Sequence, residues 1–195
     1  MQKIGLIIFS LLLLAGFASA QVPTSGNVFV GYSFENVDSS SLGFINSNRA
    51  NLNGWEATAE GKVFPWIGIV ADFGGHYGSQ SYLFDVGGLN TPLDVNAHEF
   101  TALFGPRVSV RVGKLRPFAE ALFGAAHVTT SAASTTLVDF GQPSDTSFAT
   151  ALGGGLDYTI IRPIAWRFQG DFIQTRFFGE TQNNVRFSTG IVLKF

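Results

Sequence analysis

Charged side chains recur at every second position in several stretches of this chain, with apolar residues between them. In residues 98–112, Glu99, Arg107 and Arg111 fall on one face of an extended chain, and mostly apolar residues fall on the other. Acids and bases on a shared buried face are expected to pair, because an unpaired buried charge is expensive. The same parity predicts this set of charged residues on one face: Glu35, Glu56, Glu60, Lys62, Asp72, Glu99, Arg107, Arg111, Glu120, Asp157, Arg167, Asp171, Arg186 and Lys194.

A second candidate for chemistry is His127, which is followed two positions later by Thr129. In an extended chain both side chains lie on the same face, where a histidine could activate the hydroxyl as a nucleophile. Activation also requires a third group that orients the base, and no glutamate on that face is placed to orient His127. The pair therefore predicts catalysis only weakly.

No metal or cofactor site is expected. His98 and His127 point to one face and His76 to the other, whereas a metal needs three or four converging ligands. All three histidines are expected near the outer ends of their strands, at interface level. Cysteine is absent, and the glycine runs lack the lysine and the strand–turn–helix setting of a phosphate-binding loop.

The N-terminus has the pattern of a cleaved export signal. Lys3 precedes an apolar stretch at 4–17, and the small residues at 18–20 suit signal peptidase. We expect residues 1–20 to be a signal peptide removed after Ala20, and residues 21–195 to form a single domain. The formal net charge of -2 does not suggest a nucleic-acid partner.

Strands with a period of two must position these residues, since the rest of the chain shows no convincing helical periodicity. The last segment alternates most regularly, with Val185, Phe187 and Ile191 on one face and Arg186, Ser188 and other residues on the opposite face. Most segments reach the roughly 9–11 residues that a tilted strand needs to cross the hydrocarbon. The predicted strands are 27–36, 54–64, 67–77, 98–112, 117–129, 148–160, 166–176 and 184–195.

Short and long connections alternate along the chain. The short ones carry proline, at 64–66, 113–117 and 162–163. The long polar ones are 37–53, 78–97 and 130–147, with a shorter one at 179–183. Membrane barrels alternate short periplasmic turns with longer external loops in this way.

Together these features predict an all-β fold, an eight-stranded antiparallel up-and-down transmembrane β-barrel. Closure pairs every backbone group, which hydrocarbon demands. A soluble β-sandwich or lipocalin-like barrel is the alternative, but here the charged face also carries small residues, which suits a crowded interior. Aromatic residues near the strand ends are expected to form interfacial girdles: Tyr32, Trp55, Trp66, Tyr77, Tyr158 and Trp166.

With its signal peptide, its eight alternating segments and its terminal strand, the chain resembles the OmpA/OmpX-like family of small outer-membrane β-barrels. The resemblance implies a mostly monomeric protein of the bacterial outer membrane, in contact with lipid and lipopolysaccharide, whose loops bind an unknown extracellular ligand. It also implies that the barrel-assembly machinery reads the final strand, through Phe187, Ile191, Leu193 and Phe195. No peptidoglycan-binding domain follows Phe195, so tethering to the cell wall is not expected.

We expect a non-enzymatic scaffold that serves surface binding or envelope integrity. An eight-stranded barrel is only wide enough for side chains to fill it, so a plug of ion pairs is favoured over an ion pathway. One alternative is a small porin-like pore. The other is a lipid A-modifying enzyme, because lipid A deacylases of the outer membrane are similar barrels with a lipid-facing His-x-Ser pair and an orienting glutamate. In this chain Thr129 occupies the position of the serine, and the orienting glutamate is missing.

Overall fold

The computed structural model describes residues 25–38, 49–86, 89–134 and 144–195. The signal peptide predicted at 1–20 lies outside the described residues. Within them, eight strands and one short 3-10 helix follow one another along the chain. They are β1 (Gly26–Asp38), β2 (Arg49–Lys62), β3 (Ile67–Val86), β4 (Leu89–Ser109), β5 (Leu115–Ser134), β6 (Ser144–Ile161), β7 (Ile164–Thr175), η2 (Phe177–Gly179) and β8 (Gln182–Lys194).

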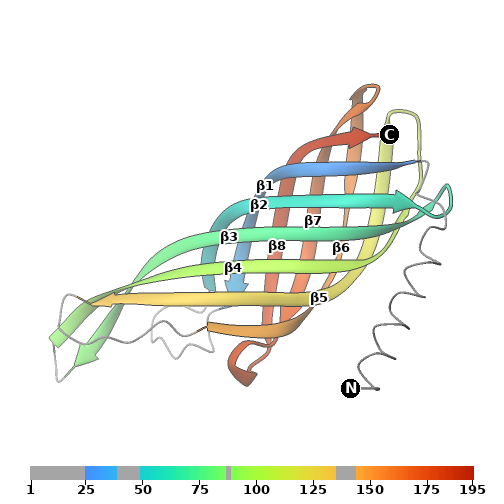
Figure 1. Cartoon of the computed structure of the whole chain (residues 1–195). Coiled ribbons are helices and arrows are strands. Elements are labelled where there is room, and N and C mark those ends of the chain that lie inside the picture. Colours follow the sequence, from blue (N-terminus) through green and yellow to red (C-terminus); the bar gives the residue numbers. More distant parts are fainter. Residues whose placement is uncertain (1–24, 39–48, 87–88, 135–143) are drawn as a thin grey trace, which may run out of the picture.

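The strands form one closed antiparallel barrel in which each strand pairs with its sequence neighbours. β1 closes the barrel by pairing with β8 from Asn27↔Lys194 to Asn36↔Val185. Figure 1 shows the strands tilted across the barrel, as closure requires. The predicted fold class is therefore confirmed.

The three tight connections lie at one end of the barrel, which we call the tight-turn end. β2 and β3 are joined through hydrogen bonds between Val63 and Ile67, and β4 and β5 through paired hydrogen bonds between Val112 and Leu115. Gly113 takes a positive φ of 62° in the second turn, a conformation that glycine adopts without a steric penalty. Phe195 is at this end too, since it exchanges backbone hydrogen bonds with Gly26.

The strands are longer at the opposite end than the sequence pattern predicts. The loop expected at 78–97 is wrong, because β3 runs to Val86, β4 starts at Leu89, and the two pair over this whole stretch. Pairing of β2 with β3 ends at Tyr77, so the β3–β4 hairpin continues past β2 (Figure 1). At about 3.4 Å per residue, its arm from Gly78 to Val86 is on the order of 30 Å long. We call this the hairpin end.

The barrel is apolar outside and largely polar inside. Outward side chains such as Val30, Phe104, Leu152 and Phe168 are about half exposed or more, whereas charged residues fill the lumen. An apolar exterior suits lipid, because it would aggregate in water. No helix in the described part of the chain is long and apolar enough to cross a membrane. A buried apolar cluster packs beside the polar residues and consists of Val70, Leu103, Leu122, Ala126, Ala149, Ala151, Ile173 and Phe177.

Candidate functional site: the charged lumen

Two arginines organise the lumen near the tight-turn end. Arg107 of β4 contacts Glu120 of β5 at 2.6 Å and Glu60 of β2 at 3.4 Å. Arg167 of β7 holds both carboxylate oxygens of Asp157 on β6, at 2.7 and 3.1 Å. Fully buried arginines need such multiple charge-assisted contacts, because desolvation of the guanidinium is costly.

Aromatic faces complete the surroundings of these guanidinium groups. The Phe118 ring lies 4.3 Å from the Arg107 guanidinium carbon and 4.6 Å from that of Arg167. Phe29 contributes a second ring, 5.0 Å from Arg167. Delocalised guanidinium groups stack on aromatic faces, and the attraction grows when both partners are desolvated. These inward phenylalanines therefore pack against the charges instead of facing lipid.

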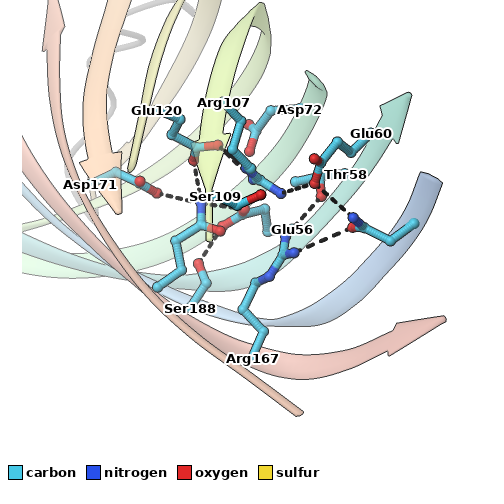
Figure 2. A network of polar contacts seen from close by, with 12 residues as sticks. Glu56, Thr58, Glu60, Asp72, Arg107, Ser109, Glu120, Arg167, Asp171 and Ser188 are labelled. Atoms are coloured by element: carbon cyan, nitrogen blue, oxygen red, sulfur yellow. Dashed lines mark hydrogen bonds and ion pairs between the residues drawn. The ribbon is translucent and has the colours of Figure 1, made fainter. Parts of the chain in front are cut away.

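Arg186 is the centre of the network in the middle of the barrel. It donates to both oxygens of Asp72 on β3 at 3.0 Å, and lies 2.9 Å from Asp171 on β7 and 3.4 Å from Glu56 on β2. Gln169 links this group to the first, since its Nε2 is 3.0 Å from both Glu56 and Glu120. Figure 2 shows the carboxylates of Glu56, Glu120 and Asp171 pointing toward one another inside the barrel.

Acidic groups outnumber bases toward the hairpin end. Glu35 accepts a hydrogen bond from Asn184 at 3.1 Å and lies 3.1 Å from Nδ1 of His76. The Oε1 atom of Glu99 is buried and has no hydrogen-bond partner among the residues that the structure describes. His76 is fully buried against Ser33, at 2.8 Å, so its predicted position at the interface is wrong.

Most residues of the predicted charged face lie in the lumen. Lys62 and Lys194 are only partly buried, near the tight-turn end. Arg111 is exposed and takes no part in the network, because β4 ends at Ser109 and the alternation stops there. The fully or almost fully buried members are Glu35, Glu56, Glu60, Asp72, Glu99, Arg107, Glu120, Asp157, Arg167, Asp171 and Arg186.

Several luminal residues were missing from that set. Arg116 donates to Glu60 at 2.8 Å and to Ser109, although the sequence pattern places it in a turn. The sequence did contain a signal for this residue, because Arg116 and Glu120 are an even number of positions apart and therefore lie on the same face of β5. Asn27 and Gln169 are neutral, so a search restricted to charges did not find Asn27, which donates to Glu60 at 2.7 Å.

The network fills the lumen from the tight-turn end to its middle. Arg107, Arg167 and Arg186 have no solvent-exposed surface, and their contacts join β4 to β2, β7 to β6 and β8 to β3. A water-filled path beside them would leave part of each side chain accessible to water. The arrangement therefore links strands across the barrel and fills the space between them.

His127 lies outside the barrel, close to two hydroxyls. Its Nε2 is 3.3 Å from Thr129 Oγ1, and its Nδ1 is 2.7 Å from Thr146 Oγ1 on β6. The nucleophile–base pair is thus present, but a hydroxyl stands where a carboxylate would orient the base. Among the described residues, no group of three or more His, Asp or Glu side chains is arranged to hold a metal ion.

The closed eight-stranded barrel with an apolar exterior and a charged, braced lumen is the fold of the small bacterial outer-membrane β-barrels. No family model and no curated protein matches the chain. Solved structures do match. Ail of Yersinia pestis in complex with the heparin analogue sucrose octasulfate has a TM-score of 0.58 at 14% identity, over 88% of this chain and 98% of that one.

Two further solved structures share the fold. Neisserial surface protein A has a TM-score of 0.59 at 10% identity, covering 87% of this chain and 97% of that chain. OprG from Pseudomonas aeruginosa has a TM-score of 0.52 at 9% identity, covering 88% and 95%. At these identities the likeness establishes the fold, and the expectation of a closed eight-stranded β-barrel is confirmed.

Proposed function

We propose that this protein is an integral outer-membrane scaffold, without enzymatic activity, whose sealed barrel carries extracellular loops for surface binding or envelope integrity. The observation that carries the proposal is the full burial of Arg107, Arg167 and Arg186 in ion pairs inside the barrel. A lumen filled in this way rigidifies the wall and leaves no route for solutes. The function then resides in the extracellular loops that the barrel carries.

The β3–β4 hairpin is the favoured binding element, because it continues on the order of 30 Å past β2. β5 pairs beside β4 as far as Leu93, and the hairpin is two-stranded beyond that residue. Residues 78–97 carry Asp85 and Asp94 and no Lys or Arg. The acidic charge disfavours a polyanion such as the heparin analogue that Ail binds, and favours a neutral or basic partner.

A test of this element is to replace residues 79–96 by a two-residue Asn-Gly turn. The barrel should still fold, because β2 pairs with β3 only as far as Tyr77 and the deletion removes partners of β5 only at Ser131–Ser134, beyond the level where β2 pairs with β3. Attachment of cells expressing the protein to host or abiotic surfaces should fall to the level of cells without it. If the barrel folds and attachment is unchanged, the hairpin is not the binding element.

Electrical recording separates the scaffold from the porin-like alternative. Protein refolded into planar bilayers should give no reproducible conductance steps, with an open porin as the positive control. Folding is verified by the mobility difference between unheated and boiled samples. If folded protein gives stable conductance steps and Arg186→Gln alters them, the scaffold proposal is wrong and the protein is a pore.

The lipid A-modifying alternative is not favoured, because a threonine hydroxyl rather than a carboxylate contacts Nδ1 of His127. Mass spectrometry of lipid A from expressing cells should show unchanged acylation. A lost acyl chain that is restored in a His127→Ala variant would overturn the non-enzymatic proposal.

Export by the signal peptide, recognition of the last strand by the barrel-assembly machinery and contact with lipopolysaccharide belong to the same proposal, as does a monomeric state. The exposed side chains of Phe187, Leu193 and Phe195 on the outer face support recognition of this strand.

A further inference from the structure

A cavity of about 250 Å³ opens at the tight-turn end, beside the C-terminal end of β8. This is smaller than pockets for drug-sized ligands, which begin near about 300 Å³, and it suits a compact headgroup. The cavity brings together residues from β6, β8 and the turns next to them. Its lining is Arg111, Thr159, Arg162, Pro163, Lys194 and Phe195.

The lining is positively charged. Arg111 and Arg162 are exposed, and neither makes an ion pair with a carboxylate among the residues that the structure describes. Lys194 donates to Thr159 Oγ1 at 3.0 Å. Asp157, whose negative charge acts on Lys194, already forms an ion pair with Arg167. Even counting the α-carboxylate of Phe195, the cavity keeps a net positive charge.

Backbone hydrogen bonds fix the frame of the cavity. The Thr159 amide donates to the Lys114 carbonyl at 2.8 Å, which ties β6 to the β4–β5 turn. The Lys194 amide donates to the Pro163 carbonyl at 2.9 Å, which ties β8 to the β6–β7 turn. A site held in place before binding loses less conformational freedom when the ligand arrives.

The surroundings place the cavity at the level of lipid headgroups. Tyr158 and Trp166 pair across β6 and β7 next to it, and both are exposed on the outer face. Ile160 and Ile161 add exposed apolar surface beside Thr159. Tyrosine and tryptophan gather at membrane–water interfaces, and arginine and lysine there attract anionic headgroups.

We propose that this cavity binds the phosphate of an anionic phospholipid headgroup, with Arg111, Arg162 and Lys194 as its cations and the neighbouring apolar surface against the acyl chains. The proposal rests on the membrane setting of the proposed function. It assigns the phosphate to a lipid of the leaflet at the tight-turn end, and not to free phosphate.

The test is native mass spectrometry of the refolded protein in detergent, titrated with phosphatidylglycerol. The double variant Arg111→Gln/Arg162→Gln should bind about 30-fold more weakly, which is the scale of two basic residues near an anionic membrane surface. The control Arg49→Gln/Arg176→Gln removes the same charge from exposed positions at the hairpin end, outside the cavity, and should bind like wild type.

An equal loss in the control variant would overturn the site in favour of general charge attraction. Full displacement of phosphatidylglycerol by millimolar inorganic phosphate would overturn the assignment to lipid. The mobility difference between unheated and boiled samples shows separately whether each variant forms a folded barrel. A missing difference would count against the proposed function. A folded barrel without selective lipid binding would count against the cavity alone.

Discussion

Replacing Arg186 by methionine should destabilise the barrel strongly, because this one side chain serves three buried carboxylates. Its guanidinium binds both oxygens of Asp72 and also contacts Asp171 and Glu56, and all four residues are buried. Methionine fills a similar volume but leaves these acids uncompensated.

The size of the loss follows from the cost of breaking one buried ion pair, about 3–5 kcal/mol. Because Arg186 has three partners, this range is a lower bound for Arg186→Met, although coupled contacts do not simply add. Arg116→Met is the matched control. Arg116 is partly exposed, and its partner Glu60 keeps Lys62, Arg107 and Asn27. A loss of roughly 1 kcal/mol is expected there.

The assay is urea unfolding of the protein refolded into phospholipid vesicles, followed by tryptophan fluorescence and by the mobility difference between unheated and boiled samples. The free energy of unfolding comes from the midpoint and the slope of the transition. Adding Asp72→Asn to Arg186→Met should recover part of the loss, since it removes one orphaned charge. The reasoning is refuted if Arg186→Met is no less stable than Arg116→Met.

Three further predictions can be tested in the same titration. Glu99→Gln should be neutral or stabilising, because Oε1 of this buried carboxylate has no hydrogen-bond partner in the described part of the chain. Glu120→Gln, which breaks the pair with Arg107, should instead cost about 3 kcal/mol, and equal losses would contradict this. Gly190→Ala should cost about 1–3 kcal/mol, since its Cβ would lie 2.4 Å from the backbone of β1, and Gly170→Ala, with its nearest atom at 3.4 Å, is the control that should stay near wild type. Phe178→Gly should stabilise the protein by about 1 kcal/mol, because Phe178 is exposed and has a φ of 54°; a loss of stability would show that its side chain makes a contact worth more than the strain.

The sequence predicts the barrel and its inner face well because both depend on a local period of two. Arg186, for example, is assigned inward by the parity of its own strand alone. Its partner Asp72 could not be predicted, since that contact crosses the lumen between β8 and β3 and depends on the stagger of all the strands between them.

Strand ends were the weak point of the sequence pattern, and they account for the errors at the site. The stretch 78–97 contains Gly, Asn and Pro residues that indicate a loop, yet its backbone is paired as a hairpin. Continuing the alternation past Ser109 assigned Arg111 inward, whereas starting the next strand too late left Arg116 in a turn. In each case tertiary pairing, and not local composition, decides where a strand stops.

The pairing of β1 with β8 has a consequence for how the protein is made. It joins residues such as Val28 and Leu193, which are among the last partners to become available as the chain grows. Until they meet, both strands present unpaired backbone groups, which hydrocarbon does not tolerate and which invite pairing with other chains. Contacts at such long sequence separation form slowly. We therefore expect membrane entry and closure of the barrel to occur as one cooperative event.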